Sequence, residues 1–131
     1  MSTWPEVLGA HADLVPTPGE ELRVQRRRRG LSAQAAAAQC GYGLAYWSQV
    51  ERGRLERTER LERRVRRLWG LAELSPGPLT VPERVDLLEQ RLGGRAAIAR
   101  RCRVSPGSVA RWSAGVSVPG EARVALLRGE L

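Results

Sequence analysis

Glycine and proline divide this 131-residue chain into short segments, most of them as long as a helix of two to four turns. Many segments begin at serine, threonine or proline and end at glycine, a pattern typical of α-helices. Alanine and leucine favour helix, β-branched residues are scattered and phenylalanine is absent. We therefore expect an all-α fold.

The expected helices, about nine in number, form two groups. The first group covers residues 3–13, 17–29, 33–40, 44–52 and 56–69, and the second covers residues 80–92, 95–102, 105–114 and 119–131. In the last helix of the first group, Leu61, Val65 and Leu68 predict one buried stripe. The sequence between the groups, LSPGPLT, is typical of a linker. The predicted domains are residues 1–74 and 80–131, joined by a linker at residues 75–79.

The chain is strongly basic, with 22 basic residues, all of them arginine, against 14 acidic residues. A division at Ser75 gives 13 − 9 = +4 for the first part and 9 − 5 = +4 for the second. Such an excess indicates a polyanionic partner, either nucleic acid or an anionic membrane surface, although a generally basic protein is the alternative. No apolar run approaches the about 18 residues of a membrane span, and no signal peptide is recognisable, so we expect a cytoplasmic protein with no membrane partner.

The two halves align with an offset of 62 residues, the difference between Cys40 and Cys102. Ala37 then falls on Ala99 and Gly53 on Gly115. Trp47 and Val50 fall on Val109 and Trp112, an exchange that conserves core volume. This alignment predicts an internal repeat of one packing unit, with chance similarity between alanine-rich helices as the alternative. Both cysteines are expected to be buried, reduced and small apolar residues of the core.

Residues 31–53, LSAQAAAAQCGYGLAYWSQVERG, resemble the Cro and lambda-repressor-like helix-turn-helix family. The resemblance rests on a small residue, a buried apolar residue, a turn glycine, two buried positions in the next helix and a Glu-Arg-Gly end. The residues at these positions are Ala37, Cys40, Gly41, Trp47, Val50 and Glu51-Arg52-Gly53. Residues 95–115 resemble the same family through Ala99, Cys102, Val104, Ser105, Val109, Trp112 and Gly115. The resemblance implies two tandem helix-turn-helix bundles that bind double-stranded DNA.

The resemblance also implies which residues face DNA. In the second unit these are Arg95, Ser105, Gly107, Ser108 and Arg111, with Arg111 suited to guanine. In the first unit they are Gln34, Gly43, Leu44, Ala45, Ser48 and Gln49, with Arg52 and Arg54 after them. The first unit departs from the family, because Ala33 stands where glutamine is common and Gln34 is one place late. We therefore expect the second unit to recognise the DNA bases better than the first. We expect the first unit to position the protein on DNA or to contact another protein.

The arginine run at residues 26–29 has two interpretations. It is either a phosphate clamp, in which Arg27 and Arg28 contact the DNA backbone, or a solvated helix face. Trp4 is likewise interpreted either as a lid on the first unit or as an anchor for a dimer arm. A homodimer is therefore left open.

The sequence favours a sequence-specific DNA-binding transcriptional regulator, with repression as the expected effect. The alternative is a protein-interaction module of the same fold that binds a polymerase, a toxin or another regulator. The sequence offers no phosphate-binding glycine loop, metal-ligand cluster or nucleophile–base pair, so we expect no enzyme activity, no metal, no cofactor and no small-molecule substrate.

Overall fold

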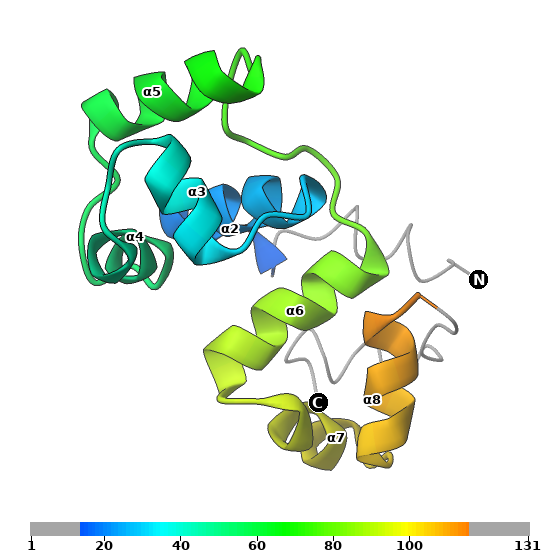
Figure 1. Ribbon diagram of the computed structural model, residues 1–131. Helices are drawn as coiled ribbons and strands as arrows, with labels where there is room; N and C mark the ends of the chain where they lie inside the picture. Colours follow the sequence, from blue (N-terminus) through cyan, green and yellow to red (C-terminus); the bar gives the residue numbers. More distant parts are fainter. Residues whose placement is uncertain (1–13, 116–131) are drawn as a thin grey trace. The chain divides into compact units, whose positions relative to one another are not determined.

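The computed structural model describes residues 14–115, and this part of the protein is all-helical, with seven α-helices and no strand (Figure 1). The all-α prediction is thereby confirmed for these residues. The helices are α2 (Pro18–Arg28), α3 (Ala33–Gln39), α4 (Leu44–Glu51), α5 (Glu59–Trp69), α6 (Val81–Leu92), α7 (Arg95–Cys102) and α8 (Pro106–Ser113). The expected helices at residues 3–13 and 119–131 lie outside the described residues, as does Trp4.

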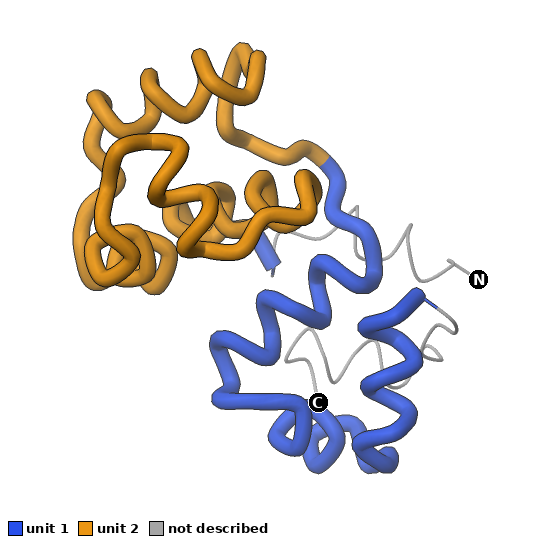
Figure 2. Tube along the Cα trace, in the orientation of Figure 1, with its two compact units in different colours: residues 1–15, 78–131 blue, residues 16–77 orange. Residues whose placement is uncertain are grey.

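The chain divides into two compact units (Figure 2). Unit 2 comprises residues 16–77 and carries α2 to α5, whereas unit 1 comprises residues 1–15 and 78–131 and carries α6 to α8. Leu14 and Val15 thus belong with the later helices and not with residues 16–77, where the sequence had placed them.

Unit 2 is built around α4, which packs on α2 and α3. Its buried core consists of Leu22, Ala36, Ala37, Cys40, Trp47, Val50, Leu61, Val65 and Leu74. The start of α2 lies against the end of α4, because a Cβ atom on Gly19 would fall 2.2 Å from the Val50 carbonyl oxygen. A glycine is therefore required where the two backbones meet.

The predicted apolar stripe of α5 is wrong at one position. Leu61 and Val65 are fully buried, but Leu68 is 51% exposed. Trp69 lies beside the core instead, edge-on to Trp47 with ring centroids 6.3 Å apart. Positions i+7 and i+8 both lie near the Leu61–Val65 face of a helix, and the ring contact with Trp47 is what places Trp69 at the core.

Unit 1 buries Leu14, Val85, Leu88, Ile98, Ala99, Cys102, Val109 and Trp112 in one cluster. Its helix α8 packs on α6 and α7. Helix α6 begins at a capping box, in which Thr80 Oγ1 accepts from the Glu83 amide and Glu83 Oε1 accepts from the Thr80 amide. A second capping box, formed by Thr17 and Glu20, opens α2 in unit 2.

Both cysteines in the described part of the chain are free and buried, as the sequence predicted. Burial raises the pKa of the Cys40 thiol above its usual value, although the charge of Arg64 opposes the change. Among residues 14–115, no helix has the length and apolar character needed to span a bilayer.

Candidate nucleic-acid interface

Three of the predicted reading residues form a connected row on α8. Ser105 is the N-cap, and its Oγ accepts from the Ser108 amide at 3.3 Å and lies 3.3 Å from Ser108 Oγ. Arg111 Nη2 donates to Ser108 Oγ at 3.2 Å. The opposite side of α8 is fixed by Val109 and Trp112, which are buried. The row thus presents two hydroxyls and one guanidinium on a helix that is held by its core.

The segment around this row is rich in arginine. Residues 95–115 contain five arginines and no acidic residue, namely Arg95, Arg100, Arg101, Arg103 and Arg111, and all five are exposed. Arg95 Nε also donates to Glu89 Oε1 of α6 at 3.2 Å, so this predicted DNA-facing side chain has an ion-pair partner in its own unit. Gly107 is exposed at the second position of α8.

Arg103 is a residue that the sequence analysis missed. It ends α7 with φ = 58°, and it is the only residue other than glycine with a positive φ in the described part of the chain. An L-residue in this conformation costs about 1 kcal/mol relative to the ordinary helical region. The signal lay in the 62-residue offset, which places Arg103 on Gly41, a glycine with φ = 76°.

The same offset joins other features of the two units. Gly43 and Ser105 are the N-caps of α4 and α8, and Gly53 and Gly115 both have φ = 76°. The Tyr42 amide donates to the Ala37 carbonyl at 2.9 Å, and the Val104 amide donates to the Ala99 carbonyl at 3.0 Å. The turns before α4 and α8 therefore share their backbone geometry.

The exposed face of α4 differs from that of α8 in its chemistry. Leu44 is 45% exposed, Ala45 and Gln49 are exposed, and Ser48 is half-buried. The N-cap of α4, Gly43, supplies no side-chain hydrogen bond. None of these five residues carries a charge. The flanking residues Gln34, Arg52 and Arg54 are all exposed, and the charges beside this face come from the two arginines. The face therefore offers one amide and one hydroxyl around an apolar centre.

The arginine run at the end of α2 is divided between two roles. Arg26 is buried, and its guanidinium donates to both Glu51 oxygens, at 2.7 and 3.1 Å. Arg29 stacks over Trp69 at 4.8 Å and donates to the Trp69 carbonyl. Burial, and then the charge of Arg28, lower the pKa of Arg29 from its usual value. Neither a clamp nor a solvated face describes these two residues, which hold unit 2 together.

Arg27 and Arg28 remain on the surface of unit 2. Arg28 Nη1 donates to the Pro76 carbonyl at 2.9 Å, which ties the end of α2 to the segment after α5. Both guanidinium groups can reach solvent, as a phosphate contact requires.

Glu51 is the second residue whose role the sequence did not reveal. It is 8% exposed, and its carboxylate accepts from Trp47 Nε1 as well as from Arg26. Arg23 adds a longer ion pair at 3.8 Å. The Glu-Arg-Gly signature of residues 51–53 therefore contains a carboxylate that joins α4 to α2, followed by an exposed arginine and a turn glycine.

Residues 19–75 match the family model described as a helix-turn-helix domain. The match begins in α2, ends after α5 and lies entirely within unit 2. No curated protein and no solved structure matches the chain. The match agrees with a helix-turn-helix family and so indicates a DNA-binding regulator.

Proposed function

We propose that this protein is a sequence-specific transcriptional regulator that reads duplex DNA mainly with α8. The observation that carries the proposal is the connected row of Ser105, Ser108 and Arg111, in which Ser105 and Arg111 are exposed and Ser108 is half-buried, set in a segment of five arginines without a carboxylate. A guanidinium on a major-groove helix can bind guanine O6 and N7 together, and hydroxyls contact bases or phosphates. A contact of this kind discriminates between bases, whereas the surrounding arginines bind phosphates.

Unit 1 acts in this proposal as a second helix-turn-helix domain of the Cro and lambda-repressor-like type, in tandem with the one in unit 2. Its support is the shared turn geometry at Gly41 and Arg103 and the buried pairs at the 62-residue offset. The domains are proposed as residues 1–74 and 80–131, with residues 75–79 as the linker, apart from the place of Leu14 and Val15 in unit 1.

Repression, a cytoplasmic location and binding as a homodimer complete the proposed function. A regulator that lies across a promoter blocks polymerase by occupying the site, which needs no further catalytic group. A dimer would double the contacted surface, because a two-fold axis repeats each half-site contact.

A protein-interaction role for unit 2 is the second candidate, and the face of α4 favours it. Gly43, Leu44 and Ala45 offer an uncharged surface with an exposed apolar centre. Interface centres are depleted of charge in the same way. A polymerase, a toxin or another regulator would be the partner. In this case unit 1 alone reads DNA, and Gln49 has no role in site preference.

The test is a competition assay on a site selected from a random pool and on random duplex. Arg111→Ala should cost about 1–3 kcal/mol on the selected site and relax the preference at one base pair. Arg27→Ala and Arg28→Ala should weaken binding to both duplexes equally, as phosphate contacts do. Gln49→Ala should change less than Arg111→Ala.

Two results would contradict the proposal. If Gln49→Ala abolished site preference and Arg111→Ala did not, the reading helix would be α4. If none of these changes affected binding to duplex DNA, the fold would serve a protein partner.

A further inference from the structure

Helix α5 carries a stripe of arginines that has no role in the proposed function. Arg60, Arg63, Arg64 and Arg67 follow the spacing i, i+3, i+4, i+7 and are all exposed, so they occupy one face of the helix. We call these four residues the α5 stripe. The buried residues Leu61 and Val65 occupy the other face and fix α5 to the core of unit 2.

No carboxylate of the described chain neutralises most of the α5 stripe. Arg60, Arg63 and Arg67 make no hydrogen bond or ion pair with another residue among 14–115. The acidic residues near the core of unit 2 are engaged elsewhere: Glu51 with Arg26, and Glu21 and Glu62 with Arg57. Unit 2 has 13 arginines and 7 acidic residues, 13 − 7 = +6, and α5 has five arginines and two acidic residues, 5 − 2 = +3, which is half of this excess.

Arg64 is held in place by the neighbouring turn. Its Nη1 donates to the Cys40 carbonyl at 2.8 Å, and its guanidinium lies 5.6 Å from the centre of the Tyr42 ring. The remaining donors of this guanidinium are still available to an acceptor in solvent, because an arginine has five. One member of the α5 stripe is therefore ordered before any partner binds.

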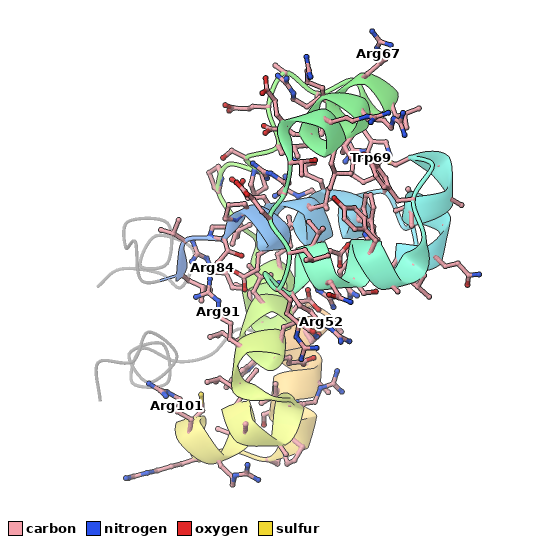
Figure 3. The ribbon with its side chains drawn as sticks, turned by 90° about the vertical axis from the view of Figure 1, so that its left-hand side faces the viewer. Arg52, Arg67, Trp69, Arg84, Arg91 and Arg101 are labelled. Carbon is pink, nitrogen blue, oxygen red and sulfur yellow. The ribbon has the colours of Figure 1, made fainter. Side chains whose placement is uncertain are left out.

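Helix α5 lies away from α4, the helix that a helix-turn-helix domain would turn to DNA, and of the α5 stripe Arg64 lies beside the turn before α4. Within unit 2, α5 and α4 lie on opposite sides in the views of Figures 1 and 3. Figure 3 shows Arg67 pointing outward from α5, whereas Trp69 turns toward the body of the unit and Arg52 lies on the α4 side. Arg67, near the end of the stripe, therefore points to a different side of unit 2 from α4.

We propose that the α5 stripe is a separate, sequence-independent binding surface for the phosphate backbone of duplex nucleic acid. Its span from Arg60 to Arg67 is about 10 Å along the helix, and duplex DNA carries one charge per about 1.7 Å of its axis. Several phosphates therefore face the stripe at once. Arginine suits this partner, because its planar group binds phosphate through two donors.

The other polyanions fit less well. A helix that binds a membrane surface inserts an apolar face into the bilayer, but Leu61 and Val65 are already committed to the protein core. An acidic protein would need exposed apolar or aromatic anchors at the centre of the interface, whereas Leu68 is the one exposed large apolar residue of α5 and the Tyr42 ring beside Arg64 is half-buried. Taking duplex nucleic acid as the partner rests on the proposed function, to which the stripe adds a second contact surface.

The experiment measures how binding of the full-length protein to a random-sequence duplex depends on salt. Arg60→Gln with Arg67→Gln removes two charges from the α5 stripe, and the control Ser75→Glu with Gln90→Glu lowers the net charge equally at exposed positions outside α5. Each phosphate contact contributes about 0.9 to the slope of log K against log salt. The stripe variant should lose about 1.8 of this slope, and the control should keep the wild-type slope. Circular dichroism confirms that each variant is folded.

Equal slopes for the stripe variant and its control would overturn the inference. So would a loss of binding to phosphatidylserine vesicles in the stripe variant with duplex binding unchanged. The proposed function is tested separately by the effect of Arg111→Ala on site preference, so either idea can fail while the other stands.

Discussion

Glu51 is the residue on which the attachment of α4 to α2 most depends. Its buried carboxylate accepts from Arg26 and from Trp47 Nε1. Glu51→Ala leaves the buried guanidinium of Arg26 without a carboxylate, with the Leu31 carbonyl still bonded to it, which should cost about 3–5 kcal/mol of unfolding free energy. Urea denaturation measures this loss. Glu56→Ala, at an exposed position, is the matched control and should stay within about 0.5 kcal/mol of the wild type.

Arg103 combines backbone strain with a charge beside the candidate reading helix. Arg103→Gly should stabilise the protein by about 1 kcal/mol, because glycine accepts φ = 58° without strain. The same change removes an exposed charge, so binding to random duplex should weaken. Thermal unfolding and a binding titration measure the two effects. A more stable variant with unchanged affinity would show that Arg103 does not contact phosphate.

Sequence reasoning at this scale succeeded where the cause is local. The serine and threonine starts of the predicted segments are N-caps in the structure, as at Ser32, Thr80 and Ser105, whose side chains accept from amides three residues ahead. It failed where the cause is distant, since Arg26 meets a carboxylate 25 residues away and the run of four arginines shows no difference among its members. The sequence predicted Leu68 on the buried stripe of α5, but Trp69 packs against the core instead, because spacings of i+7 and i+8 both fit an apolar stripe.

Two glycines, Gly107 within α8 and Gly115 after it, should respond in opposite ways to replacement by alanine. At Gly107 the φ is not positive, and a new Cβ would meet only Ser105 Oγ at 3.7 Å. Gly107→Ala should therefore stabilise unit 1 by about 0.5 kcal/mol. Gly115→Ala, at φ = 76°, should destabilise it by about 1 kcal/mol. Denaturant titration distinguishes the two signs, and equal effects would contradict the observed backbone geometry.

The elements themselves were largely predictable, because a serine or threonine caps the start of five of the seven described helices and a glycine follows the end of every one of them except α7. The start of α5 was placed three residues early, since Thr58 is the N-cap and accepts from the Leu61 amide. The exposed faces of α4 and α8 could also be predicted, because they lie opposite the buried residues Trp47 and Val109. Whether a face binds DNA or protein is not encoded in that periodicity, which reports burial alone.

At the scale of the whole molecule, the linker at residues 75–79 stays a prediction, and the two compact units divide between Gly77 and Pro78. The sequence did not indicate that Leu14 and Val15 belong with the later helices. Leu14 is 7% exposed within the core of unit 1, and Arg91 Nη2 donates to the Val15 carbonyl at 2.8 Å. These contacts join residues more than 70 positions apart in the sequence, and no local sequence pattern predicts a contact between residues so far apart.

The position of Leu14 predicts that a change near the N-terminus will destabilise the C-terminal unit. Leu14→Ala removes a buried side chain and should lower the stability of unit 1 by about 2–5 kcal/mol. Hydrogen exchange followed by mass spectrometry reports each unit separately: amides of α6 to α8 should lose protection, and those of α2 to α5 should not. Val15→Ala is the control, because Val15 is 59% exposed. Loss of protection in α2 to α5 alone would assign Leu14 to unit 2, and the reading helix α8 would then be independent of the N-terminal segment.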